Sequence, residues 1–273
     1  MSAHSLRTGL AALAAALLLA SCGSSGDGGS STASPAAGND LKLVQAGTLT
    51  ACSDVPYPPF EVEDASAPSG YSGFDMDLLQ KIADGLGLKL VVNDVSFDAL
   101  QSGTVLASGQ CDIAASAMTI TPARQKNLDF TDPYYDSLQS LLVPVDSGIK
   151  SINDLAGKKV GVQQGTTGKH YAEEHAKGAS INEFPSDGEL WPALQAGQID
   201  AILQDLPVNI VHEKADAKYK VVEEYKTDEQ YGFAMSKGER PELLKAVNAQ
   251  LKTLRDDGTY QKIYDSYFAI KAS

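Results

Sequence analysis

Positively charged residues and histidines are scarce in this 273-residue chain. It holds 22 lysines and arginines against 35 aspartates and glutamates, which gives a formal net charge of −13, and the positive residues form no run or stripe. This pattern excludes nucleic acid and anionic membrane surfaces as expected partners. Among the 4 histidines, His170 and His175 are five residues apart and diverge on a helix, and no Ser-His-Asp order stands out. We therefore expect no metal and no cofactor.

No segment after residue 22 is apolar enough to span a bilayer. The apolar run at residues 10–20 follows Arg7 and is shorter than the roughly 20 residues of a spanning helix, so it predicts a secretory signal peptide. The run ends in Leu-Ala-Ser-Cys, which resembles the lipobox of bacterial lipoproteins. This resemblance implies that residues 1–21 are removed and that the Cys22 thiol carries lipid. An ordinary signal peptide with a chance cysteine is the alternative.

Residues 22–39 are rich in glycine and serine and carry no apolar pattern. Such a composition is typical of a flexible tether. The sequence therefore predicts an extracytoplasmic lipoprotein that is anchored to the cell membrane only through its N-terminal lipid.

Cysteine is nearly absent from the rest of the chain, where only Cys52 and Cys111 occur. Export permits a disulfide. Both residues, however, lie in or beside segments that we expect to form neighbouring parallel strands, where side chains rarely meet disulfide geometry. We expect two buried thiols, with a disulfide as the alternative.

Strand-like and helical segments alternate through most of the chain. The helical segment at residues 75–87 places Leu78, Leu79, Ile82 and Leu86 on one face. Two further helices at the C-terminus are divided at Gly258. The alternation predicts α/β architecture with parallel sheet covered by helices on both faces. The predicted strands are residues 48–54, 88–94, 111–118, 158–164 and 199–205.

One short pattern occurs twice. GQCDIAASA at residues 109–117 and GQIDAILQD at residues 197–205 both follow a helix end and read Gly-Gln-x-Asp before a strand. Four shared positions are also compatible with chance. If the repeat is structural, it predicts two lobes of similar topology, each with a functional residue at the C-terminal end of a strand, where α/β sheets bind ligands.

Arg124 stands at an unusual place. Thr121 and Pro122 form a helix start, with a capping hydroxyl before a proline at the first helical position. A cation in the first turn is disfavoured by about 0.3–1 kcal/mol. The position therefore indicates a nearby anion, held by the guanidinium and by backbone N–H groups. A surface pairing with Asp129 or Asp132 is the alternative.

Two other strand ends carry residues suited to a ligand. In SDVPYPPFE at residues 53–61, three prolines in four residues predict a stiff loop that presents Tyr57 and Phe60 beside Asp54. These aromatic residues suit a pocket wall, and core packing is the alternative. After the strand at residues 158–164, the sequence Gln164-Gly165-Thr166-Thr167 begins a helix and favours an anion. It lacks the Gly-Lys-Ser/Thr of a phosphate loop.

Six segments carry a resemblance to a known family. They are SDVPYPPFE, GYSGFDMDLL, ASAMTITPARQKNLDFTDPYY, GKKVGVQQGTT, GQIDAILQD and DDGTYQKIYDSYF, in this order. Together they resemble the extracellular solute-binding proteins, family 3, which serve ABC importers of polar amino acids. The resemblance implies a periplasmic-binding-protein-like type II fold with two lobes, each a mostly parallel sheet flanked by helices, and a ligand cleft between them. It implies lobe 1 at residues 40–136 plus 233–273 and lobe 2 at residues 139–230, with hinge strands near residues 137–143 and 231–237.

The same resemblance implies ligand contacts. Arg124 would clamp the α-carboxylate of an amino acid, and Asp205 from the other lobe would take the α-ammonium. Asp54 would face the side chain. The full implied set of ligand-binding residues is Asp54, Tyr57, Phe60, Phe97, Ser116, Ala117, Thr119, Arg124, Gln164, Thr166, Thr167 and Asp205. The protein would act as a monomer, not as an enzyme, and would deliver its ligand to permease subunits after closure of the lobes.

Two departures bear on ligand identity. Ala117 stands where many relatives have a second serine, and the segment before Cys111 is about two residues longer than usual. The charges of Asp54, Arg124 and Asp205 sum to −1, which favours a basic side chain and leaves glutamine open. An acidic ligand is the least expected. The alternatives in function are an amino-acid-sensing lipoprotein without transport and a cyclohexadienyl-dehydratase-like enzyme with Asp54 or Glu61 as proton donor.

Overall fold

The structure, a computed structural model, describes residues 41–269. The predicted signal peptide, the lipidation site Cys22 and the tether lie outside these residues and stay predictions. Between residues 41 and 269, no helix combines the length and the apolar character needed to cross a membrane.

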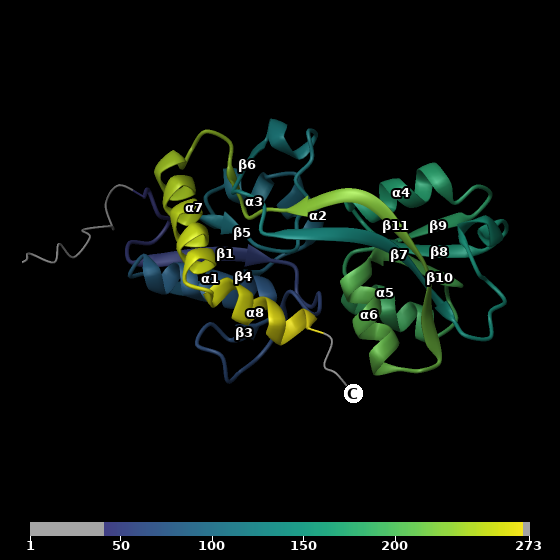
Figure 1. Cartoon of the computed structure of the whole chain (residues 1–273). Coiled ribbons are helices and arrows are strands. Elements are labelled where there is room, and N and C mark those ends of the chain that lie inside the picture. Colours follow the sequence, from purple (N-terminus) through teal and green to yellow (C-terminus); the bar gives the residue numbers. More distant parts are fainter. Residues whose placement is uncertain (1–40, 270–273) are drawn as a thin grey trace, which may run out of the picture. The chain divides into compact units, whose positions relative to one another are not determined.

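Two five-stranded sheets form the framework (Figure 1). In the first sheet, β4 and β5 are parallel to β1, whereas β12 is antiparallel to both β5 and β6. The alternation of strands and helices predicted parallel sheet, and the strand β12, which returns from the C-terminal part of the chain, makes the sheet mixed. The strand order is β4 (Lys89–Asp94), β1 (Thr48–Ser53), β5 (Ile113–Ala114), β12 (Ala234–Ser236) and β6 (Leu128–Phe130).

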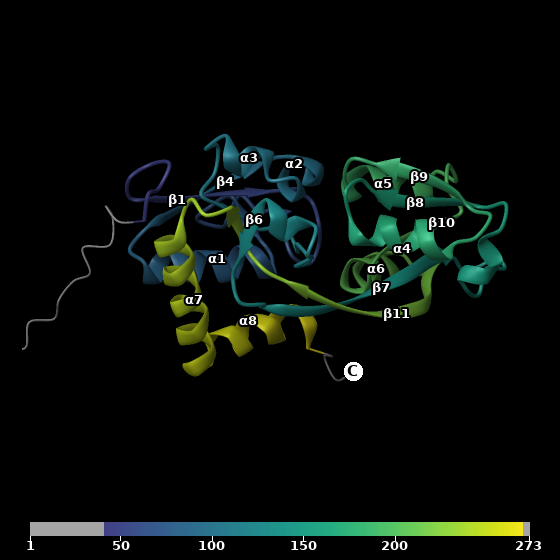
Figure 2. The same cartoon turned by 90° about the horizontal axis from the view of Figure 1, so that it is seen from above.

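The second sheet is also mixed. β8 is parallel to β9 and β10, and β7 is antiparallel to β10 and β11. The chain enters this sheet along β7 and leaves it along β11, and these two long strands lie side by side (Figure 2). The predicted lobe boundaries stay a prediction. The strand order is β11 (Tyr219–Tyr231), β7 (Tyr135–Pro144), β10 (Ala201–Asp205), β8 (Lys159–Gln163) and β9 (Ser180–Phe184).

Helices pack against each of the two sheets, as the resemblance implied. Those that contact the first sheet or one another beside it are α1 (Phe74–Gly85), α2 (Phe97–Gln101), α3 (Thr104–Ala107), α7 (Pro241–Asp256) and α8 (Thr259–Phe268). Those on the second sheet are α4 (Thr167–His175), α5 (Asp187–Gln195) and α6 (Leu206–Ala215). The shorter elements are the pair β2 (Val62–Glu63) and β3 (Tyr71–Ser72) and the 3₁₀ turns η1 (Arg124–Lys126) and η2 (Ile152–Leu155).

The amphipathic helix and the C-terminal helix pair are confirmed. In α1, Leu78, Leu79 and Ile82 are fully buried. Gly87 follows the helix with φ +68°, a conformation that suits glycine at a helix end. Gly258, with φ +78°, separates α7 from α8 in the same way.

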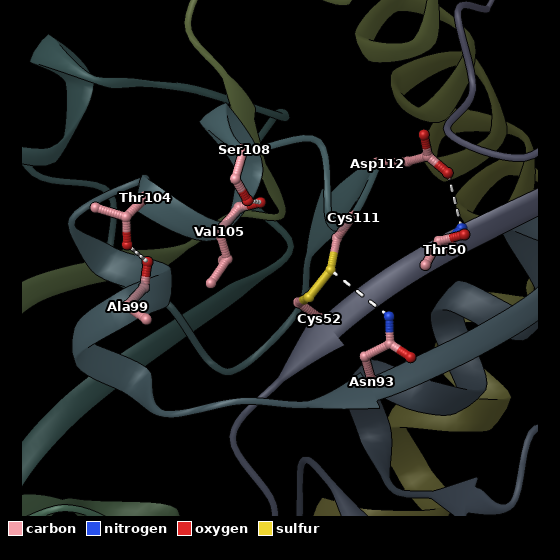
Figure 3. The surroundings of a disulfide bond; sticks show 9 residues. All are labelled: Thr50, Cys52, Asn93, Ala99, Thr104, Val105, Ser108, Cys111 and Asp112. Carbon is pink, nitrogen blue, oxygen red and sulfur yellow. Dashed lines mark hydrogen bonds between the residues drawn. A yellow bond between two sulfur atoms is a disulfide. The ribbon is translucent and has the colours of Figure 1, made fainter.

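The repeated Gly-Gln-x-Asp pattern has the same structure in both sheets. The Asp112 N–H donates to the Thr50 carbonyl (2.8 Å), and its Oδ2 accepts from the Thr50 N–H (2.9 Å; Figure 3). Asp200 makes the same reciprocal pair with Lys159, at 2.8 Å in both directions. Each aspartate therefore fixes the register between its strand, β5 or β10, and the parallel neighbour. The repeat is structural, and both strands end at the same kind of sheet edge.

The strand predicted at residues 111–118 is shorter than expected. Only Ile113–Ala114 pair as β5. Ala117 has φ +44° and donates its N–H to Asp75 Oδ2 (2.9 Å), so the backbone turns away from the sheet. The turn brings Ser116 and Ala117 to the end of the strand rather than along its side.

The prediction of two buried thiols is wrong: Cys52 and Cys111 form a disulfide (Figure 3). Cys111 precedes β5 and belongs to no strand, so its side chain is not held perpendicular to the sheet as in a strand. The two Cα atoms are 5.8 Å apart, within the usual range for disulfides. The bond joins β1 to the segment that leads into β5.

We expect the Cys52→Ser/Cys111→Ser double variant to lose stability, because the bond spans 59 residues of sequence. Closing a loop of that length in the unfolded chain corresponds to about 4 kcal/mol, or about 8–16 °C in melting temperature. Urea unfolding with and without reductant measures the loss. Reductant should destabilise the wild type and leave the double variant unchanged; equal stability of both proteins without reductant would contradict the prediction.

Candidate functional site

One pocket collects side chains from both sheets. Most of its residues follow the C-terminal ends of strands, where open α/β sheets bind ligands. The lining residues are Asp54, Tyr57, Phe97, Ser116, Ala117, Thr119, Arg124, Gln163, Thr166, Thr167 and Asp205.

Asp54 follows β1 and is 4% exposed. Its Oδ2 accepts from the Phe97 N–H (2.6 Å) at the start of α2 and from Gln163 Nε2 (3.3 Å) at the end of β8. Burial raises the pKa of Asp54 to about 7, more than these hydrogen bonds lower it. The protonation of this carboxyl therefore changes near neutral pH and is sensitive to the charge of a ligand.

Arg124 is 6% exposed, which rules out the surface pairing with Asp129 or Asp132. The Thr121 hydroxyl accepts from the Arg124 N–H (3.2 Å), as the predicted cap requires, but the helix is a single 3₁₀ turn. The guanidinium donates to the carbonyls of Thr119 (2.7 Å) and Gly165 (3.0 Å).

The guanidinium carbon of Arg124 lies 5.2 Å from the centre of the Phe97 ring. This is a cation–π distance. Burial lowers the pKa of Arg124 to about 10, so the group stays charged at neutral pH. The pocket therefore contains a fixed, desolvated cation.

Asp205 ends β10 and receives donors from three directions. Its Oδ2 accepts from the hydroxyls of Tyr57 (2.9 Å) and Tyr231 (2.6 Å), and its Oδ1 accepts from Gln139 Nε2. Burial, followed by the charge of Glu229, raises the pKa of Asp205 to about 7. Near neutral pH this carboxyl is therefore partly protonated.

Two threonines near Arg124 donate to a carboxylate of the protein itself. Thr119 Oγ1 and Thr167 Oγ1 each donate to Glu229 Oε2 at 2.8 Å. Thr166 caps α4, because its hydroxyl accepts from the Lys169 N–H (3.1 Å). Glu229 is therefore the anion that these two hydroxyls bind in the described residues.

Ten of the twelve residues named from the sequence line the pocket, and their role as ligand contacts stays a prediction. Phe60 and Gln164 do not lie there. Phe60 is fully buried among aromatic rings, with Tyr135 at 5.2 Å and Tyr231 at 5.4 Å, as the core-packing alternative stated. The Gln164 side chain is exposed, because neighbouring residues at a strand end point to opposite faces and Gln163 takes the pocket side.

Sequence reasoning missed Gln163, Gln139 and Glu229. The alternation along KVGVQ could have identified Gln163. Val160 and Val162 are buried on one face of the strand, and Gln163, the next residue, points to the opposite face. Glu229 gave no such signal. A register shift in β11 before Glu229 and a φ of +52° at Asp228 turn its side chain inward.

Comparison with known proteins agrees with this architecture. Residues 49–270 match the model of the bacterial extracellular solute-binding proteins, family 3. The ABC transporter glutamine-binding protein of Bacillus subtilis is 34% identical over 271 residues, which cover 94% of each chain. A putative ABC transporter arginine-binding protein of Escherichia coli is 32% identical, and the match covers 85% of this chain and 95% of that protein.

A solved structure extends the likeness to three dimensions. An ancestral arginine-binding protein bound to glutamine superimposes with a TM-score of 0.76 and 37% identity, covering 83% of this chain and all of the other. The fold is the type II fold of periplasmic amino-acid-binding proteins. The chain thus belongs to the bacterial extracellular solute-binding proteins, family 3.

Proposed function

We propose that this protein binds a polar L-amino acid with a basic or amide side chain and delivers it to an ABC importer. One observation carries the proposal: a buried guanidinium, that of Arg124, and a buried carboxyl, that of Asp205, both line the same pocket. An amino acid carries the complementary pair of charges on one carbon atom.

Arg124 supplies the carboxylate end. A guanidinium has five N–H donors, of which Arg124 uses two for the Thr119 and Gly165 carbonyls. Among the contacts of the described residues, three donors are left for a planar anion. A bidentate pair with a carboxylate fits this geometry, and burial strengthens such a pair relative to water.

Asp205 supplies the ammonium end. The hydroxyls of Tyr57 and Tyr231 both donate to Oδ2 and hold the carboxyl in place. An arriving ammonium group compensates the buried charge and displaces the proton that burial favours. Binding is therefore coupled to proton release from this residue.

Asp54 and Gln163 offer acceptor oxygens to the ligand side chain. Both line the pocket, and they contact each other. A guanidinium, an ammonium or an amide N–H₂ group would donate to them, whereas a side-chain carboxylate would meet Asp54 with the same charge. The relatives named above bind glutamine or arginine, which supports this class of ligand.

Residues from both sheets line the pocket, so a bound ligand would connect them. This arrangement supports ligand-driven closure of the two lobes as the signal to the permease. In this proposal the protein is a monomer, held at the membrane by lipid on Cys22.

The dehydratase alternative has one observation in its favour. A carboxyl with a pKa raised to about 7 by burial, such as Asp54, is suited to donate a proton near neutral pH. We favour binding alone, because Asp205 would have no role toward a carboxylate that lacks an amine.

Arg124→Ala should abolish ligand-induced stabilisation. Thermal unfolding of the wild type with each common amino acid at about 1 mM should show, for a micromolar ligand, a gain of about 4 kcal/mol and about 8–16 °C. The variant should show no shift. Arg255→Ala, at an exposed position, is the matched control and should respond like the wild type. No shift of the wild type with any amino acid would refute the proposed function.

Asp54→Asn should lower the affinity for arginine relative to glutamine by about 10- to 100-fold, because the charged hydrogen bond to a guanidinium is lost. Calorimetric titration of both ligands gives the ratio. The control is Asp94→Asn, which changes an exposed carboxyl nearby. An unchanged ratio would show that Asp54 does not face the ligand side chain.

Binding should release protons below neutral pH. Burial raises the pKa of Asp205 to about 7, so at about pH 6 its proton competes with the ligand ammonium. The apparent affinity should fall by up to about tenfold per pH unit below pH 7 for this carboxyl. Calorimetry in two buffers of different ionisation enthalpy counts the protons. Identical heats in both buffers at pH 6 would contradict the coupling.

A further inference from the structure

Two carboxyl groups lie behind the pocket wall without lining it. Glu61 follows the proline-rich loop and Asp75 lies in the first turn of α1, and both are fully buried. Glu61 Oε1 accepts from the Ser116 hydroxyl at 2.7 Å. Asp75 Oδ2 accepts from the Ala117 N–H at 2.9 Å and from the Tyr134 hydroxyl at 2.6 Å. Each acid therefore contacts a residue of the pocket.

The other oxygen of each carboxyl has no partner. Glu61 Oε2 and Asp75 Oδ1 are both buried and make no hydrogen bond within the part of the chain that the structure describes. A buried carboxylate oxygen without a donor is strongly disfavoured. Two carboxyls that repel each other in a buried place titrate as a pair, and one of them retains its proton to a higher pH.

The charges that act most strongly on the two acids, among the residues that the structure describes, are those of other carboxyl groups. Burial raises the pKa of Glu61, and the charge of Asp75 acts on it most strongly, followed by those of Asp54 and Asp205. Burial also raises the pKa of Asp75 to about 7, against hydrogen bonds from Tyr134 and Ala117 that lower it. The charges that act on Glu61 are thus negative.

We propose that Glu61 and Asp75 share one proton between Oε2 and Oδ1, and that this pair positions Ser116 and Ala117 as hydrogen-bond acceptors at the ammonium end of the pocket. The proton is held in the unliganded protein. Only the effect on ligand affinity depends on the proposed function.

Ser116 shows how the pair acts. A hydroxyl has one proton, and that of Ser116 is donated to Glu61 Oε1. The hydroxyl oxygen of Ser116 also accepts a hydrogen bond from the Asp54 N–H at 3.1 Å. Among the contacts of the described residues, the Ser116 hydroxyl is left with one lone pair, and a donor such as an ammonium group is the matching ligand. Asp75 holds Ala117 in its φ of +44° in the same way.

Glu61→Gln tests the shared proton without any ligand. The amide oxygen still accepts from Ser116, and the amide N–H₂ donates to Asp75 in place of the proton. Urea unfolding of unliganded protein at several values between about pH 5.5 and 6.5 gives the unfolding equilibrium constant. If the folded protein retains one proton that the unfolded chain releases, this constant rises tenfold per pH unit.

The wild type should therefore lose stability with rising pH more steeply than Glu61→Gln, by about tenfold per pH unit. Asp75→Asn should show the same difference from the wild type, and it replaces Glu61→Gln in the test if that variant folds poorly. The slope of the Glu61→Gln/Asp75→Asn double variant should also differ from that of the wild type by the equivalent of one proton. Glu63→Gln, an exposed change two residues away, is the control and should match the wild type. Equal slopes for wild type and single variants, or a difference of two protons for the double variant, would overturn the shared proton.

The positioning role has its own readout. Glu61→Gln should keep ligand affinity within a few-fold, whereas Glu61→Leu, which removes the acceptor for Ser116, should lower it at least tenfold. Equal affinity of the leucine variant and the wild type would overturn the positioning role. A wild type that binds no amino acid would refute the proposed function instead and would leave the proton measurement intact.

Discussion

The burial of one guanidinium among several carboxyl groups is the constraint on which the pocket depends. Water cannot solvate these groups, so each needs a donor, a proton or an opposite charge from its neighbours. Arg124 finds two carbonyls, and Asp205 finds two tyrosine hydroxyls and an amide. Neither uses the other as its direct partner, although Asp205 is the charge that acts most strongly on Arg124. A zwitterionic ligand offers each of them a compensation that the empty protein lacks.

The fold brings these groups together because parallel strands end at one sheet edge. The edges of both sheets supply the pocket: Asp54 and Ser116 follow strands of the first, and Gln163 and Asp205 end strands of the second. β1, β5 and β10 are buried along their whole length, and polar side chains from both sheets meet at the strand ends. In the proposed function, these few polar residues decide specificity.

Much of this could be read from the sequence, because it depends on local rules. The strand and helix alternation, the stop at Gly87, the division at Gly258 and the cap at Thr121 all follow from short-range patterns. The remainder depends on contacts between distant segments. The disulfide requires the path of the chain before β5, and the inward turn of Glu229 requires the register of β11 against β7. The position of Phe60 also depends on distant segments, because aromatic rings from α1, β7 and β11 enclose it in the core and keep it out of the pocket.

The reciprocal hydrogen bonds of Asp112 have a consequence for sequence variation. They set the register of β5 against β1 only four residues before Ser116. A change of length between α3 and Asp112 therefore does not shift Ser116 and Ala117. Asp200 holds Asp205 in the same way. A single residue inserted between Asp112 and Ser116, or between Asp200 and Asp205, would instead displace side chains that line the pocket.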